Sequence, residues 1–140
     1  YSVGASMYAC MAAAAPQVDR LAKAPRKPEF LFLEGGKRVL TDGSQTLELY
    51  DIGPTPHAEH ILIAHLPAEG IVWEADHFPV PPTGVIPPAV PVTRAFAEAL
   101  ERLDLEYGKL VGAHSPRVAG PADLAMALRR QPANAAAAGM

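Results

Sequence analysis

Apolar and polar residues in the first half of the chain follow the pattern of β-strands. Thr46–Ile52 alternates polar and apolar residues, as a half-buried strand does. Asp42-Gly43, which lies between two such segments, is a strong hairpin signal. Five strands are predicted here: Phe30–Leu33, Arg38–Thr41, Thr46–Ile52, Ile61–Leu66 and Ile71–Ala75. Because short turns join them, we expect a meander of antiparallel strands.

The spacing of apolar residues changes to that of a helix after Pro91. Phe96, Leu100 and Leu103 recur at i, i+4 and i+7, which is the repeat of one helix face. The proline-rich segment Asp76–Val90 is predicted to be a loop. The remaining elements are helices over Pro91–Leu103 and Pro121–Arg130, a strand over Lys109–Ala113, and helical pieces over Ala5–Ala15 and Gln17–Lys23.

This order of elements predicts a single α+β domain over residues 1–130 and a flexible tail over residues 131–140. Its sheet is an antiparallel meander with the helices on one face. The strands supply apolar residues for both faces, Ile63 and Trp73 among them. Because the helices cover one face only, we expect the chain to associate through the other.

Composition narrows the class of protein. The chain has 140 residues, of which 49% are hydrophobic and 19% charged, as in a folded domain with its own core. Its net charge is −3 and no run of Lys or Arg exceeds two residues, which argues against a nucleic-acid partner. No apolar run approaches the ~20 residues of a membrane span. The single cysteine, Cys10, cannot form an internal disulfide.

Candidate chemistry lies where predicted strands begin or end. His57 precedes one strand, whereas Asp76 and His114 each follow one. Residues at the same edge of neighbouring strands converge, and imidazole nitrogens with a carboxylate oxygen suit zinc. Two other interpretations stay open. Each histidine could make an ordinary hydrogen bond, and Glu74 with Asp76 could form an acid/base pair.

An order of turn, strand, turn and strand links these residues. The segments are Gly53-Pro-Thr-Pro-His57, Ile61-Leu-Ile-Ala-His-Leu-Pro67 and Ile71-Val-Trp-Glu-Ala-Asp76, followed later by Leu110-Val-Gly-Ala-His114-Ser-Pro. Together they resemble the second half of the metallo-β-lactamase-fold hydrolases, over about Phe30 to about Leu128. The resemblance implies the second sheet, with its helices, of an αββα sandwich.

The resemblance also implies roles for these residues. His57 would complete the first metal site, Asp76 would bridge two metals, and His114 would bind the second. His77, next to Asp76, is a candidate for a residue that supports a ligand. The complete protein would hold one or two zinc ions. A zinc-bound hydroxide would hydrolyse an ester, lactone, thioester or lactam.

The chain also departs from that family. The first half of the family carries a His-x-His-x-Asp-His motif, which this sequence lacks, and Ala113 replaces the usual glycine before the last ligand. The chain begins at Tyr1 rather than Met. We therefore expect the C-terminal part of a hydrolase, inactive without its missing N-terminal half, with that half or a second copy as its partner. The alternative is a non-catalytic half-domain that assembles through its open sheet face.

Overall fold

The computed structural model describes residue 24 and residues 31–130, and contacts divide the chain into two units, Tyr1–Phe32 and Leu33–Met140. The fold below is that of the second unit. The helices expected at Ala5–Ala15 and Gln17–Lys23 and the expected tail lie outside the described residues. The expectation of one domain over residues 1–130 stays a prediction.

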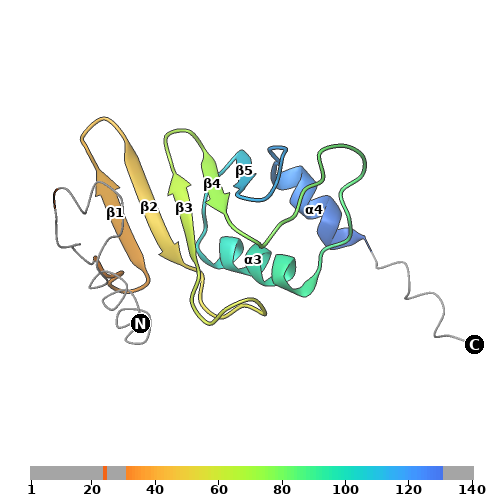
Figure 1. The fold of residues 1–140 in the computed structure, drawn as a ribbon, viewed down its shortest axis with the longest axis horizontal. Helices are drawn as coiled ribbons and strands as arrows, with labels where there is room; N and C mark the ends of the chain where they lie inside the picture. The colour runs from red at the N-terminus through yellow and green to blue at the C-terminus, as the bar shows by residue number, and fades with distance from the viewer. Residues whose placement is uncertain (1–23, 25–30, 131–140) are drawn as a thin grey trace, which may run out of the picture. The chain divides into compact units, whose positions relative to one another are not determined.

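Five strands form a single open sheet in the order β1-β2-β3-β4-β5 (Figure 1). The strands are β1 (Lys37–Thr41), β2 (Thr46–Asp51), β3 (Leu62–Leu66), β4 (Ile71–Glu74) and β5 (Lys109–Gly112). The first four pair antiparallel, so the predicted meander is confirmed. The last pair, β4 and β5, is parallel. A long crossover through a loop and a helix joins them, as parallel neighbours require.

The prediction of a strand at Phe30–Leu33 is wrong for residues 31–33, the part of it that the structure describes. Residues 31–33 are outside any strand, and Glu34 forms a single bridge to Lys37. Gly35 and Gly36, with φ of 62° and 80°, make the turn between them. Over residues 31–36 of the described chain, this bridge is the extent of the strand pairing.

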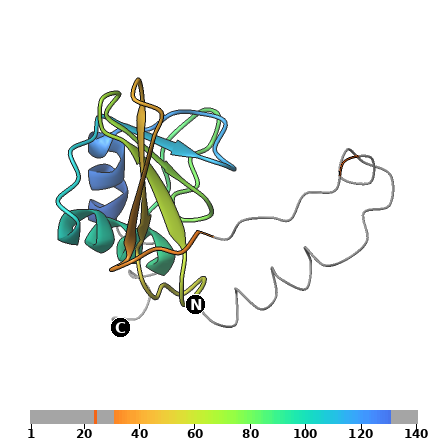
Figure 2. The ribbon, with the colours of Figure 1, turned by 90° about the vertical axis from the view of Figure 1, so that its left-hand side faces the viewer.

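Two helices cover one face of the sheet, α3 (Pro91–Arg102) and α4 (Pro121–Arg129). Figure 2 shows both on the same side of the strands. Each begins at a proline, where the missing N–H costs no hydrogen bond. The core between the helices and the sheet includes Tyr50, Ile63, Val72, Phe96, Leu100, Leu110 and Leu124. Neither helix of the described part is long and apolar enough to cross a membrane.

The opposite face of the sheet carries apolar side chains that stay exposed. Strand residues alternate between faces, so Trp73, which pairs with Ala64 and Val111, points away from the helices. Trp73 and Leu62 are each 41% exposed. This open face, formed by Leu40, Leu49, Leu62, Ala64, Trp73 and Val111, has no helix of the described part over it.

A charged network ties the first three strands together on the helix-facing side. The Glu48 carboxylate accepts hydrogen bonds from Lys37 Nζ at 2.8 Å and from the Tyr50 hydroxyl at 2.7 Å. His65 Nδ1 lies 3.2 Å from the same carboxylate, and its Nε2 lies 3.1 Å from the Glu106 carbonyl. The hydrogen bonds from Lys37 and Tyr50 lower the pKa of Glu48 to about 2.

This network predicts a dependence of stability on acidic pH. The pKa of Glu48 is lower in the folded state, so its carboxylate stabilises the fold above its ordinary pKa of 4.5. That stabilisation is lost as the pH falls through about 2. We expect Glu48→Gln to flatten the fall in the free energy of unfolding between these two pH values, measured by urea titration. Glu69→Gln, in the exposed β3–β4 turn, should behave as wild type, and equal slopes for Glu48→Gln and wild type would contradict this account.

Candidate functional site

Three segments bring the candidate residues to one edge of the sheet. His57 lies in the loop between β2 and β3, Asp76 follows β4, and His114 follows β5. The loop of His57 is folded by Thr55, whose Oγ1 accepts the backbone N–H of His57 at 3.2 Å and of Ala58 at 3.3 Å. The start of this loop is tied to α3, because Arg102 donates to the Ile52 carbonyl at 2.8 Å.

The Asp76 carboxylate stands between the two imidazoles. Its Oδ1 lies 3.1 Å from His114 Nε2, and its Oδ2 lies 3.5 Å from His57 Nε2. The side chains of His57, Asp76 and His114 are 50%, 40% and 74% exposed, so solvent reaches all of them. The structure thus brings the predicted residues together, whereas their role as metal ligands stays a prediction.

The backbone of Asp76 adopts a conformation that is uncommon for a residue with a side chain. Its φ is 69°, in the left-handed region. Aspartate tolerates this region better than most residues, but the conformation still needs support from its surroundings. The turn it makes takes the chain off the end of β4. Residues with unusual backbone angles gather at functional sites, which makes Asp76 a candidate for such a role.

The residue types of this cluster suit a divalent cation, but their positions do not form a metal site. Two imidazoles and a carboxylate are typical zinc ligands. In the structure, however, each imidazole faces a separate oxygen of Asp76. Across the described residues, no group of three or more His, Cys, Asp or Glu side chains is placed so that it could hold a metal ion. In the structure the cluster is a His–Asp–His set in which each imidazole lies within ion-pair distance of the carboxylate.

A cavity of about 390 Å³ opens beside this cluster. His57, Asp76 and His114 line it together with Glu74, Phe78, Pro79 and Ser115. Glu74 is only 2% exposed, and its Oε2 accepts the backbone N–H of His77 at 2.8 Å. The acid/base pair of Glu74 with Asp76 that the sequence leaves open stays a prediction. In the structure the buried Glu74 carboxylate holds the turn around Asp76.

Glycine at position 112 makes room for the groups behind the cavity. A Cβ there would lie 2.7 Å from both Glu74 Oε1 and Ser115 Oγ, which is closer than real contacts allow. The Ser115 hydroxyl accepts the Val80 N–H at 3.0 Å and donates to the Phe78 carbonyl at 3.1 Å. Gly112 therefore lets the turn after β5 and the loop after β4 pack against each other.

We expect Gly112→Ala to destabilise the protein by about 1–3 kcal/mol, because the added methyl group must displace buried polar atoms. Gly108→Ala is the matched control, since a Cβ at that position has no neighbour within 4 Å. Denaturant unfolding of both variants measures the difference. If Gly112→Ala is as stable as Gly108→Ala, the close approach at Gly112 is not a constraint.

The other histidines divide into one beneath the site and two away from it. His77 is fully buried, with its ring centroid 5.5 Å from that of Phe96 and 6.3 Å from that of His57. Neither of its ring nitrogens has a hydrogen-bond partner, although Nδ1 lies 3.5 Å from Glu74 Oε2. His60 pairs with Asp51 at 2.8 Å, and His65 belongs to the Glu48 network. The supporting role of His77 stays a prediction.

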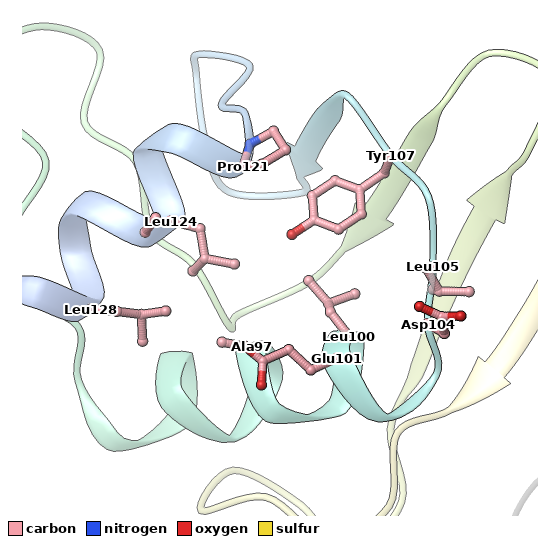
Figure 3. Close-up of a pocket in the computed structure, with 10 residues that line it drawn as sticks. Ala97, Leu100, Glu101, Asp104, Leu105, Tyr107, Pro121, Leu124 and Leu128 are labelled. Atoms are coloured by element: carbon pink, nitrogen blue, oxygen red, sulfur yellow. The ribbon is translucent and has the colours of Figure 1, made fainter.

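A second cavity, of about 220 Å³, lies between α3 and α4. Leu100, Leu124 and Leu128 line it, and Figure 3 shows the Tyr107 hydroxyl pointing toward the space between the helices. Burial, with a smaller effect from the nearby Glu101 carboxylate, raises the pKa of Tyr107. The lining holds no histidine or cysteine, so the candidate chemistry is at the first cavity.

Comparison with known proteins gives one kind of match. No family model matches the sequence, and no curated protein matches it. Among solved structures, the chain is similar to the metallo-beta-lactamase FIM-1 from Pseudomonas aeruginosa in its mono-zinc form. The identity is 19% and the TM-score 0.46, over 77% of this chain and 49% of that one. The chain therefore spans about half the length of that structure. A similarity of this size assigns neither family nor activity.

Proposed function

We propose that this chain is the C-terminal part of a metal-dependent hydrolase and supplies part of its metal site. The observation that carries the proposal is the meeting of His57, Asp76 and His114 beside a cavity, although they come from three separate segments. Histidines that only contact solvent would not be expected to meet around one carboxylate. Imidazole, carboxylate and imidazole are the donor set that zinc prefers.

In this proposal the chain contributes binding and orientation. His57, Asp76 and His114 would bind the cation, and zinc would supply Lewis-acid activation of water and of a substrate carbonyl. Phe78 and Pro79 form an apolar wall of the cavity against which a substrate would pack. The substrate class that we propose is an ester, lactone, thioester or lactam. The remaining ligands would come from residues outside this set, because no three donors of the described residues are placed to hold an ion together and a pair of metals needs more donors still.

Zinc stoichiometry and turnover of the purified chain test this proposal. We expect weak binding of zinc, measured by equilibrium dialysis, and no turnover of a lactam and a thioester panel. Weak binding that is lost when His57 and His114 are both replaced by alanine supports the proposal. Tight binding of two zinc ions by the monomer, or no binding at millimolar zinc, would overturn it.

The open face supports a second candidate function, a non-catalytic half-domain that forms a homodimer. Its exposed Leu62 and Trp73 lie opposite the helices. Burying such a patch gains about 25 cal/mol per Å² before the cost of ordering, and a twofold axis pairs the same patch with itself.

Light scattering at micromolar concentration should show a dimer that Trp73→Glu dissociates and that Val85→Glu, in an exposed loop, does not. A wild-type monomer would rule out this candidate.

A further inference from the structure

The residue after Asp76 is held at both of its backbone polar groups. The N–H of His77 donates to Glu74 Oε2 at 2.8 Å, and its carbonyl accepts from Thr93 Oγ1 at 2.6 Å. Glu74 is the last residue of β4, and Thr93 lies in the first turn of α3. Hydrogen bonds from two separate elements therefore hold the backbone of the residue that follows Asp76.

The two hydrogen bonds to the His77 backbone are buried. Glu74 and Thr93 are each 2% exposed and His77 is fully buried, so water does not compete for these hydrogen bonds. The His77 ring, packed against Phe96, prevents the residue from rotating away. The backbone at position 77 is fixed by the sheet, by the helix and by the core.

The fixed backbone at His77 adjoins the unusual conformation of Asp76. Asp76 has a φ of 69°, whereas an extended conformation would direct its side chain elsewhere. Such a conformation persists only where surrounding contacts over-determine it. Glu74 and Thr93 supply contacts of this kind to the next residue, His77.

We propose that Glu74 and Thr93 are positioning residues, which hold Asp76 in its left-handed turn and so place its carboxylate between His57 and His114. This inference rests on the proposed function, because the benefit of that placement is metal binding. Neither residue needs to touch the metal. Groups that orient metal ligands from behind are known to change metal affinity by about 10–100-fold when they are removed.

Paired variants of the full chain separate positioning from a general loss of stability. Glu74→Leu removes the acceptor for His77 N–H, whereas Glu74→Gln keeps a carbonyl oxygen in its place. Thr93→Val removes the hydroxyl with little change of shape, whereas Thr93→Ser keeps it. Glu98→Gln, on the exposed side of α3, is the control for loss of a carboxylate.

Zinc affinity, from a titration with zinc chloride followed by NMR, and hydrogen exchange of the His77 amide are the two readouts. We expect Glu74→Leu and Thr93→Val to bind zinc about 10–100-fold more weakly. Glu74→Gln, Thr93→Ser and Glu98→Gln should keep the wild-type affinity. Glu74→Leu should also speed exchange at His77, and Glu74→Gln should not. If Glu74→Leu does not fold, Thr93→Val against Thr93→Ser decides the question.

Wild-type affinity in both Glu74→Leu and Thr93→Val would overturn the inference. Equal losses in the conservative variants would overturn it too, because geometry would then not be the cause. If the wild-type chain binds no zinc, the proposed function fails by itself. Positioning is then decided by crystal structures. Separations of Asp76 from His57 and His114 that are unchanged in Thr93→Val and Glu74→Leu would overturn it, and increased separations would support it.

Discussion

Replacing Asp76 by asparagine is expected to abolish detectable zinc binding. Both imidazoles of the site face the Asp76 carboxylate, at 3.1 and 3.5 Å, so this side chain is the centre of the donor set. Loss of a group that only supports a ligand costs about 10–100-fold in affinity, and loss of an anionic ligand should cost at least about 100-fold. Asparagine tolerates the left-handed backbone, so the turn itself should persist.

The chain supplies a matched control for this substitution. Asp104 is the other aspartate with a positive φ among residues 31–130, at 50°, and it is exposed just after the end of α3. Asp104→Asn should bind zinc as wild type does, in a titration followed by NMR. If the two variants bind equally well, Asp76 is not a ligand, and the metal-site proposal loses its central residue.

The largest loss of stability is expected for Phe96→Ala. Phe96 is fully buried on α3, and its ring packs against that of His77 beneath the site. Removal of a buried phenylalanine ring costs about 3–5 kcal/mol, because it loses burial and leaves a cavity. Domains of this size are stable by about 5–15 kcal/mol, so the variant should lose a large fraction of its stability and unfold at a clearly lower urea concentration.

Urea unfolding of Phe96→Ala, with Val85→Ala as the control, measures this loss. Val85 is 65% exposed, so its truncation should change the free energy of unfolding by less than about 0.5 kcal/mol. The disrupted support should also loosen the His57–Asp76 pairing, because the His77 ring is in contact with the rings of both Phe96 and His57. A Phe96→Ala variant as stable as Val85→Ala would show that α3 does not anchor the core.

Local pattern was sufficient to predict most of the described elements. Thr46–Ile52 alternates cleanly and became β2, and the i, i+4, i+7 repeat at Phe96 became α3. The strand predicted at Phe30–Leu33 is not formed over residues 31–33, because an apolar run becomes a strand only where a ladder forms beside it, which the local pattern does not specify. The parallel pairing of β5 likewise depends on the path of the crossover, which local pattern does not specify.

In the candidate site, too, the sequence predicted some features and not others. The meeting of His57, Asp76 and His114 followed from their places at strand ends. The support by Glu74, Thr93 and Gly112 did not, because it depends on register and on the distance between a strand and a helix. The pairing of Glu74 with Gly112 across β4 and β5 could have been found only once the parallel register was known.

The identity of the histidines that respond to zinc tests the central claim most directly. Side-chain ¹H–¹⁵N spectra of the wild-type chain, recorded during a zinc titration, resolve each imidazole. The account predicts that the resonances of His57 and His114 shift together, with at most one ion bound, while those of His60 and His65 stay in place because they are paired with Asp51 and Glu48. Shifts at His60 or His65 instead, or none at His57 and His114, would contradict it.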